Sequence, residues 1–356
     1  MFKLKYDDFL EQDESGAYYV PKEQQVRDEV EKHRWKEIGK TILLDWRLYL
    51  MLVPMLLVYI LWKYMPMYEL TGCFKNPESA DRVNDQWWVG IHFFTKLLVN
   101  PEISPYFWNA FRNTFITAFY GLLFGFPVPI ILALFFNEVR SNVARSVLQV
   151  CAYLPKFLST VIVTTLAIML FRPYQKVMGA PDQVAGLLSR LFQLFGAEAN
   201  LVRDGLLYST KYYRAIYVIT DLWEHAGYDS IVFFAAVIAV SPTSYEAAQI
   251  DGAGKMAQMR YVVLPSILST VVIMLIMKIG SLLSVGYEKI YLLLDDGNYE
   301  VANVVSTLSN EWSGPNGIQY GRAYGMAAEM LNNLIGMILV IGANTIARRA
   351  ADVSLY

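Results

Sequence analysis

The sequence predicts an all-α, polytopic membrane protein with six transmembrane helices. Of its 356 residues, 55% are hydrophobic and only 17% are charged, whereas an average soluble domain has about 25% charged residues. The apolar residues also fall in long blocks of the length that a helix needs to cross about 30 Å of hydrocarbon. These observations exclude a disordered chain, a collagen and an ordinary soluble enzyme.

Charge and cysteine content exclude further classes. The net charge is −2, with 30 basic and 32 acidic residues, so no strong field favours nucleic acid as a partner. Cys73 and Cys151 are the two cysteines, and they are far apart among three scattered histidines. This distribution indicates neither a disulfide framework nor a metal site.

Six segments have the length and hydrophobicity of membrane spans. They are Leu48–Met65, Thr114–Phe136, Leu148–Phe171, Ile216–Val240, Ile267–Gly286 and Tyr324–Ala347.

Polar residues and prolines distinguish these spans. Pro127 and Pro129 predict a bend in the second span, and Pro155 interrupts the third. The fourth span is the most polar, since Asp221, Trp223, Glu224 and His225 interrupt it. One lysine, Lys278, lies in the fifth span, and one glutamate, Glu329, in the sixth.

The chain begins with a charged leader, residues 1–47. The first apolar run starts near Leu48, too far along the chain for a cleaved secretion signal. Within the leader, Glu23–Leu44 has apolar residues at helical spacing and predicts an amphipathic helix on the membrane surface, or a docking element for a partner subunit. Lys and Arg are denser in the leader, in the loops of residues 137–146 and 241–263 and in the 348–356 tail than in the other loops. Both termini are therefore expected in the cytoplasm.

The most informative segment joins the fourth and fifth spans. Ser244 is suited to cap a first helix, Gly252 to form a tight turn, and a second helix is expected to run to Pro265. Pro265 would then fall in the first turn of the fifth span, where a missing N–H costs little. Such a helix–turn–helix makes a rigid projection that another protein can push.

This segment resembles the EAA loop of permease subunits of bacterial ABC importers. Glu246-Ala247-Ala248, Gly252 and Leu264-Pro265 fall on the family pattern in register, with Val262 in place of isoleucine. The resemblance implies that the 241–265 loop docks on the ATPase and transmits its closure. The residues that it places in this coupling role are Tyr245, Glu246, Ala247, Ala248, Asp251, Gly252, Ala253, Leu264 and Pro265.

The similarity extends over nearly the whole chain after the leader. Stretches such as FWNAFRNTFITAFYGLLFGFPVPIILALFFNEV and VGYEKIYLLL look like the polysaccharide and aldouronate branch of carbohydrate permeases. It implies a type I importer permease fold over residues 48–347, embedded in the bacterial cell membrane. The implied partners are a second permease subunit, two ATPase subunits, an extracellular solute-binding protein and an oligosaccharide. Because the sequence has no Walker A motif, ATP and Mg²⁺ are expected in the ATPase and no cofactor in this chain.

The fourth span contains candidate substrate residues. Intramembrane charges usually face a cavity or a partner, and a carboxylate beside aromatic rings is suited to hold a sugar. In the maltose-type permeases that this chain resembles, the equivalent stretch lines the sugar site, which implies roles for Asp221, Trp223, His225 and Tyr228. The alternative is that these side chains bridge helices or lie at the membrane interface.

Lys278 has two interpretations. It forms a buried ion pair with Asp221 or Glu329, or it meets the carboxylate of an acidic sugar. Three further residues follow it at intervals that place them on or near the same helical face: Ser281, Ser284 and Tyr287.

The predicted function is therefore half of the translocation pathway of an ATP-driven oligosaccharide importer. A permease for amino acids, phosphate or another oxyanion is an alternative from the same class. A membrane enzyme is disfavoured because the histidines are scattered, and a secondary transporter because no internal repeat is found.

Overall fold

The structure is a computed structural model that describes residues 11–12, 18–19, 38, 44–77, 86–171, 186–196, 205–314, 317–318 and 321–351. The chain divides into two compact units, Met1–Leu70 and Thr71–Tyr356. Apart from the paired two-residue strands β1 (Glu11–Gln12) and β2 (Tyr18–Tyr19), the regular elements of the described residues are helices, which confirms the all-α fold class. The predicted helix of residues 23–44 lies outside the described residues except at Ile38 and Leu44.

In the first unit, the first predicted span is helical. It comprises α2 (Trp46–Tyr59), η2 (Ile60–Tyr64) and α3 (Met65–Met67), and helix continues through η3 (Tyr68–Phe74). None of the α2 residues is buried within the chain. A helix that is apolar on all sides needs lipid or another protein around it, as a membrane span does.

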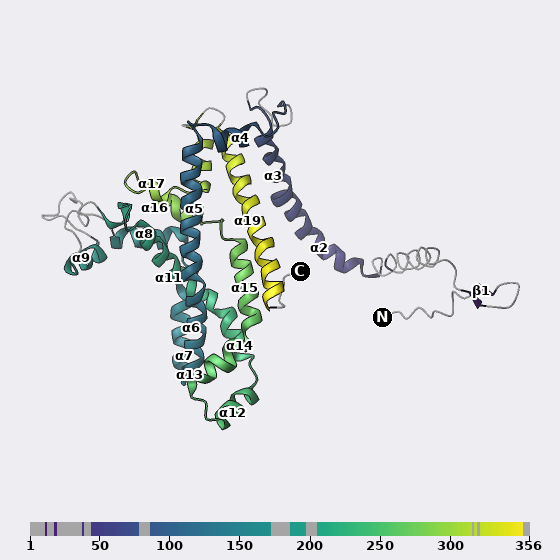
Figure 1. Cartoon of the computed structure of the whole chain (residues 1–356), viewed down its shortest axis with the longest axis vertical. Coiled ribbons are helices and arrows are strands. Elements are labelled where there is room, and N and C mark those ends of the chain that lie inside the picture. The colour runs from purple at the N-terminus through teal and green to yellow at the C-terminus, as the bar shows by residue number, and fades with distance from the viewer. Residues whose placement is uncertain are drawn as a thin grey trace. The chain divides into compact units, whose positions relative to one another are not determined.

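The second unit contains the remaining spans and the loops between them (Figure 1). Its helices are α4 (His92–Val99), α5 (Ser104–Gly125), α6 (Pro127–Glu138), α7 (Asn142–Tyr153), η5 (Leu154–Phe157), α8 (Thr160–Phe171), α9 (Leu187–Leu194), η6 (Leu206–Tyr208), α11 (Tyr213–Ile238), α12 (Pro242–Ile250), α13 (Lys255–Gln258), η7 (Met259–Val263), α14 (Leu264–Ser266), α15 (Leu268–Gly280), α16 (Tyr287–Leu293), α17 (Tyr299–Ala302), α18 (Val305–Ser313) and α19 (Gly321–Ala351).

Among the described residues, three helices are long and apolar enough to span a membrane, and the count reaches six when each of three bent pairs is taken as one span.

The second predicted span is longer than expected, since α5 and α6 together run from Ser104 to Glu138. Pro127 begins α6 and marks the junction, with no bend above 40°. The third predicted span is interrupted, as Pro155 predicts: the chain bends by 98° between η5, which contains Pro155, and α8. A proline that removes a backbone hydrogen bond explains the break.

The fifth and sixth spans also differ from the prediction. The fifth span ends at Gly280, six residues earlier than predicted. The chain between Gly280 and the start of α16 is not helical. The sixth, α19, starts three residues early at Gly321 and continues through Arg348 and Arg349 to Ala351. The basic residues in its last turn suit the partial negative charge at a helix C-terminus.

Among the described residues of the second unit, three apolar clusters join the helices. One joins α4, α5, α18 and α19, where Phe93 and Tyr324 meet edge to face at 5.0 Å between ring centroids. A second joins α8, α11, α16 and α17 around Tyr213 and Ile290. A third lies where α11 ends and α15 begins, and it contains Val240. The loop helices α4 and α16–α18 therefore pack against the ends of the spanning helices.

Helix α11 is the central element of this unit, packing on α5, α6 and α7. Gly227 lets α11 approach α7 closely, because a Cβ at this position would lie 2.0 Å from the carbonyl oxygen of Ala152. The hairpin of α12 and α13 lies at one end of the unit, and α4 lies at the other (Figure 1).

Candidate functional site

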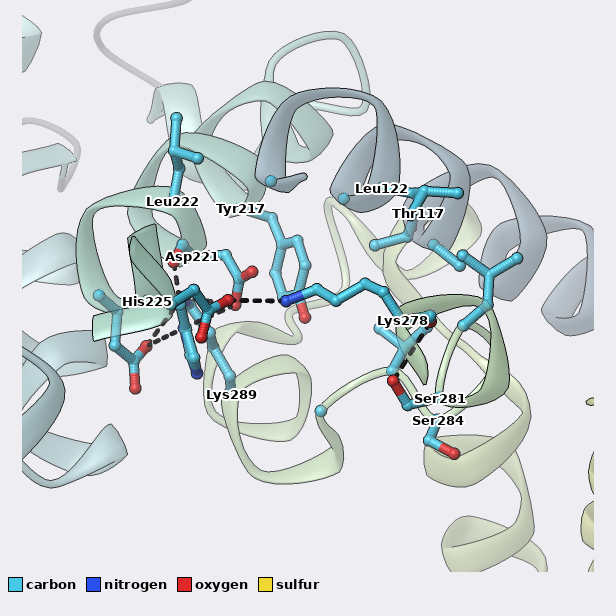
Figure 2. A pocket seen from close by; sticks show the side chains of 18 of the residues that line it. Thr117, Leu122, Tyr217, Asp221, Leu222, His225, Lys278, Ser281, Ser284 and Lys289 are labelled. Atoms are coloured by element: carbon cyan, nitrogen blue, oxygen red, sulfur yellow. Dashed lines mark hydrogen bonds and ion pairs between the residues drawn. The ribbon is translucent and has the colours of Figure 1, made fainter. Parts of the chain in front are cut away.

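A cavity of about 610 Å³ lies between α5, α11, α15 and α16, and we call it the polar chamber. Its charged and titratable lining residues are Lys156, Asp221, Glu224, His225, Asp229, Lys278, Glu288 and Lys289. Asp221 and His225 approach it from one side and Lys278 from the other (Figure 2). The chamber thus combines hydrogen-bond acceptors with ammonium donors, which is the chemistry needed to bind hydroxyl and carboxylate groups.

Lys289 is the buried cation of the chamber. Its Nζ lies 3.1 Å from Glu224 Oε2 and 3.5 Å from Asp221 Oδ1, and 5.4 Å from the centre of the Tyr217 ring. The side chains of Lys289 and Glu224 are only 4% and 5% exposed. A buried charge is tolerated only when it is paired, so this contact fixes α16 against α11.

Lys278 pairs with a carboxylate that the sequence analysis did not select. Its Nζ donates to Asp229 Oδ2 at 2.8 Å, and the two side chains are 40% and 27% exposed. The expected partners, Asp221 and Glu329, were therefore wrong. Asp221 lies about two helical turns before Asp229 on α11 and is already engaged by Lys289.

The structure brings six of the eight predicted substrate residues to the polar chamber. These are Asp221, His225, Lys278, Ser281, Ser284 and Tyr287.

The two aromatic residues that were predicted as substrate residues in the fourth span do not line the polar chamber. Trp223 and Tyr228 are absent from the chamber lining and are 50% and 45% exposed. Trp223 is two residues from both Asp221 and His225, and a 100° turn per residue directs it away from their face. The Tyr228 ring packs edge to face on Phe157 of η5 instead. The aromatic rings that do line the chamber belong to Tyr217 and Tyr287.

Ser281, Ser284 and Tyr287 line the chamber. The prediction that they share one helical face with Lys278 was wrong. Because α15 ends at Gly280, Ser281 caps the helix, Ser284 lies in the connection and Tyr287 begins α16. A nonhelical chain segment therefore forms this wall.

A second cavity of about 230 Å³ adjoins the first, and we call it the apolar chamber. It is lined mainly by Phe126, Pro129, Phe233, Met274 and Met277. The two chambers share four lining residues, which are Gly125, Asp229, Lys278 and Ser281.

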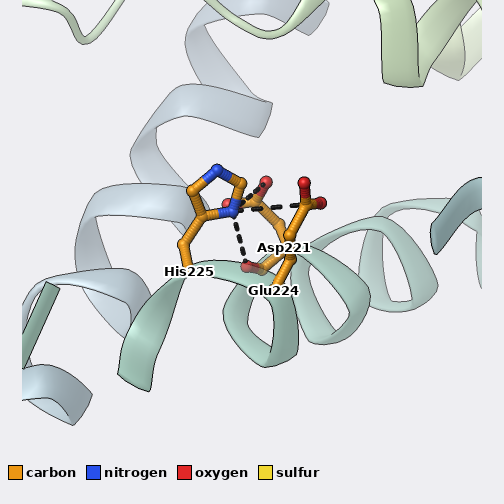
Figure 3. A group of neighbouring side chains, drawn as sticks. All are labelled: Asp221, Glu224 and His225. Atoms are coloured by element: carbon orange, nitrogen blue, oxygen red, sulfur yellow. Dashed lines mark hydrogen bonds and ion pairs between the residues drawn. The ribbon is translucent and has the colours of Figure 1, made fainter. Parts of the chain in front are cut away.

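Asp221, Glu224 and His225 form the group best placed to hold a metal ion among the described residues, with ligand atoms all within 4.8 Å (Figure 3). His225 Nδ1 lies 3.5 Å from Asp221 Oδ1 and 3.9 Å from Glu224 Oε2. However, the Lys289 ammonium already contacts both carboxylates. This arrangement satisfies the carboxylates without a metal, and the group is better described as a charge cluster.

The hairpin between α11 and α15 has the predicted helix–turn–helix form. Gly252 adopts φ +77°, and the N–H groups of Gly252 and Ala253 donate to the carbonyl groups of Gln249 and Ala248 to close α12. Ser241, not Ser244, precedes the helix, because Pro242 is suited to the first helical position. Glu246 lies on the exposed surface of α12.

Polar and apolar contacts tie this hairpin to the bundle. Lys255 Nζ of α13 donates to Glu138 Oε2 at the end of α6. Tyr245 packs against the apolar cluster at the end of α11, and burial raises the pKa of its phenol above the ordinary value. The hairpin is therefore in contact with both α6 and α11.

Pro265 does not lie in the first turn of the fifth span. It belongs to α14, and the helix that runs from Lys255 to Ser266 is bent by 62° from α15 at Ile267. Because proline cannot donate to the preceding turn, the hairpin helix ends near this residue and the span starts afresh at Leu268.

Comparison with known proteins identifies relatives over most of the chain. The profile of the family "binding-protein-dependent transport system inner membrane component" matches residues 125–286. The polygalacturonan/rhamnogalacturonan transport system permease protein YteP of Bacillus subtilis (strain 168) is 34% identical over 310 residues, covering 87% of this chain and 90% of that protein. Protein LplB of the same organism is 33% identical over 311 residues, covering 87% and 91%.

A solved structure is also similar. One chain of a bacterial ABC transporter involved in the import of the acidic polysaccharide alginate superposes with a TM-score of 0.74 at 33% identity, covering 88% of this chain and 99% of that chain. The alginate ABC transporter in complex with a periplasmic protein bound to alginate pentasaccharide gives a TM-score of 0.73 at 31% identity.

Replacing Lys289 by methionine tests the buried ion pair. The variant leaves Glu224 charged and unpaired, so we expect a loss of about 3–5 kcal/mol in stability. The double variant Lys289→Met/Glu224→Gln removes both charges and should recover most of that loss. Thermal unfolding of the purified complex measures both effects, with Lys156→Met as the control, since Lys156 is in no ion pair with the described residues. Equal stability of Lys289→Met and the unmodified protein would contradict the assignment.

Proposed function

Since this chain belongs to the family of binding-protein-dependent inner membrane transport components, a family of multi-pass ABC importer permeases, we propose that it forms half of a saccharide pathway. The observation that carries this proposal is the polar chamber, whose walls come from four predicted spans and the loop helix α16. A second permease subunit supplies the other half. ATP hydrolysis then takes place outside this chain, in two partner ATPase subunits that hold ATP and Mg²⁺.

The hairpin is the proposed contact with an ATPase subunit. Its exposed surface includes Glu246, Ile250 and Met256, the latter two being 86% and 75% exposed. Apolar side chains exposed to this degree at a projecting loop are typical of an interaction site. Closure of the ATPase pair would push the hairpin and, through Lys255 and Tyr245, the ends of α6 and α11.

The proposed substrate is an acidic oligosaccharide that contains uronic acid residues. One relative is named for polygalacturonan and rhamnogalacturonan transport, and the similar solved structure imports the acidic polysaccharide alginate. In this chain, Lys278 is 40% exposed at the chamber wall, where its ammonium can reach a substrate carboxylate. Tyr217 and Tyr287 offer rings to the C–H faces of the sugar. An extracellular binding protein would deliver this substrate.

We place both termini in the cytoplasm. This orientation puts the coupling hairpin on the ATPase side and α16–α18 on the opposite side, toward the binding protein. It rests on the density of Lys and Arg in the loops.

Two substitutions in the hairpin test coupling. Glu246→Lys reverses an exposed charge, and Gly252→Val forces a β-branched residue into φ +77° at a cost of about 1–3 kcal/mol. Uptake and substrate-stimulated ATP hydrolysis should fall about tenfold while the complex still assembles. Gly254→Ala is the matched control, because Gly254 has φ −69° and open space around it. Normal uptake by both test variants would refute the coupling role.

Thiol labelling tests the orientation. In a Cys73→Ala/Cys151→Ala background, a cysteine at Asp296 should react with an impermeant thiol reagent in intact cells. A cysteine at Asn142 should react only after the membrane is opened. Both positions are exposed, so burial does not explain protection. The reverse pattern would overturn the orientation and the proposed ATPase contact.

The role of Lys278 is tested with two matched probes, tri-galacturonic acid and its uncharged methyl ester. The double variant Lys278→Gln/Asp229→Asn removes the ion pair without leaving an unpaired charge. We expect the ratio of acid to ester uptake to fall about tenfold, because a hydrogen bond to a charged group is lost. The same binding protein serves both importers, so its own preference cancels in the comparison. An unchanged ratio would eliminate Lys278 as the acid-recognising residue.

A further inference from the structure

The Lys278–Asp229 ion pair lies on the boundary between the two chambers. Both residues line the polar chamber and the apolar chamber, as do Gly125 and Ser281. A Cβ at Gly125 would meet no atom within 4 Å, so this boundary has open space beside the ion pair. A solute that passes from one chamber to the other must therefore pass the Lys278–Asp229 contact.

The two lysines that form ion pairs in the polar chamber differ in how firmly they are held. Lys289 is 4% exposed and contacts two carboxylates. Lys278 is 40% exposed and contacts one carboxylate, Asp229, which is itself 27% exposed. Ion pairs exposed to solvent have a free energy near zero. The Lys278 pair is thus the one that an incoming carboxylate can replace at little cost.

This ion pair also connects the two helices that flank the coupling hairpin. Asp229 lies on α11, which leads into α12, and Lys278 lies on α15, which follows α14. Besides this contact, α11 and the α14–α15 junction meet in the apolar cluster of Val237, Val240, Val263 and Ile267. Breaking the ion pair removes a polar link between the helices on either side of the hairpin.

We propose that Asp229 is an internal ligand of Lys278 that a saccharide carboxylate replaces as the substrate crosses between the chambers. The inference rests on the proposed function, in which an acidic oligosaccharide passes this wall. Exchange keeps one carboxylate on Lys278, so the ammonium is paired before and after the step. The released Asp229 faces the chamber as a free carboxylate and repels the bound anion, which limits how long the substrate stays.

If Asp229 competes with the substrate carboxylate for Lys278, it should affect both substrate affinity and substrate release. An internal competitor reduces the apparent affinity for the substrate in proportion to the time that it occupies the site. It also promotes release, and a transport site must bind weakly enough to let its cargo leave. Asp229→Asn should therefore tighten binding of an acidic saccharide and slow its transport. A residue with a purely structural role would not produce these opposite changes.

The experiment uses the assembled permease and ATPase subunits. Equilibrium binding of tri-galacturonic acid to this detergent-purified complex without the binding protein gives Kd, and uptake into proteoliposomes with the binding protein present gives the turnover number. For Asp229→Asn we expect Kd to fall about two- to fivefold and turnover to fall by a similar factor. The methyl ester should change less than about twofold in both measurements.

Glu288→Gln is the matched control, since Glu288 is an exposed carboxylate of the polar chamber and is in no ion pair with the residues described. If it tightens binding of the acid as much as Asp229→Asn does, a general loss of negative charge explains the effect and the exchange is refuted. An unchanged or weaker affinity of Asp229→Asn also refutes it.

Failure of the carboxylate exchange and failure of the proposed function can be distinguished. If Asp229→Asn binds the acid no more tightly but Lys278→Gln/Asp229→Asn still loses the preference for acid over ester, Lys278 recognises the substrate without exchange. If the double variant keeps the preference, the acid-recognition proposal itself fails.

Discussion

The carboxylates of α11 are paired with cations, because an isolated charge buried in a membrane-spanning helix is unfavourable. Helix α11 presents Asp221, Glu224 and Asp229 toward the polar chamber, and the cations come from two different segments. Lys289 on α16 neutralises the first two, and Lys278 on α15 neutralises the third. Both ends of the connection after the fifth span are thereby joined to the central helix, and the walls of the chamber are set by these contacts.

The two ion pairs differ in burial, and we assign stability to the buried one and propose a role in transport for the exposed one. The buried Lys289 contact holds α16 beside the apolar cluster of α8, α11 and α17. The exposed Lys278 contact lies where the polar and apolar chambers meet and between the helices that flank the hairpin. A chamber wall that is partly rigid and partly exchangeable fits the proposed transport of an acidic saccharide, which must be bound and then released.

Local signals explain why the hairpin was predictable from the sequence. Its turn depends on Gly252 and its helices on neighbouring residues, so contiguous sequence defines it. The partner of Lys278 was not predictable, because the choice between Asp221 and Asp229 depends on how α15 crosses α11. The end of α15 at Gly280 was also not predictable from hydropathy, since Leu282, Leu283 and Val285 continue the apolar run. Hydropathy shows where apolar residues lie but not where a helix ends.

The most direct test of this account is a cryo-electron microscopy structure of the complete importer with an oligogalacturonide in its pathway. The account predicts a saccharide carboxylate about 3 Å from Lys278 Nζ, with Asp229 turned away and Lys289 still bound to Glu224. A saccharide seated elsewhere, with the Lys278–Asp229 pair intact beside it, would contradict the claim that this ion pair is the point at which the substrate is recognised.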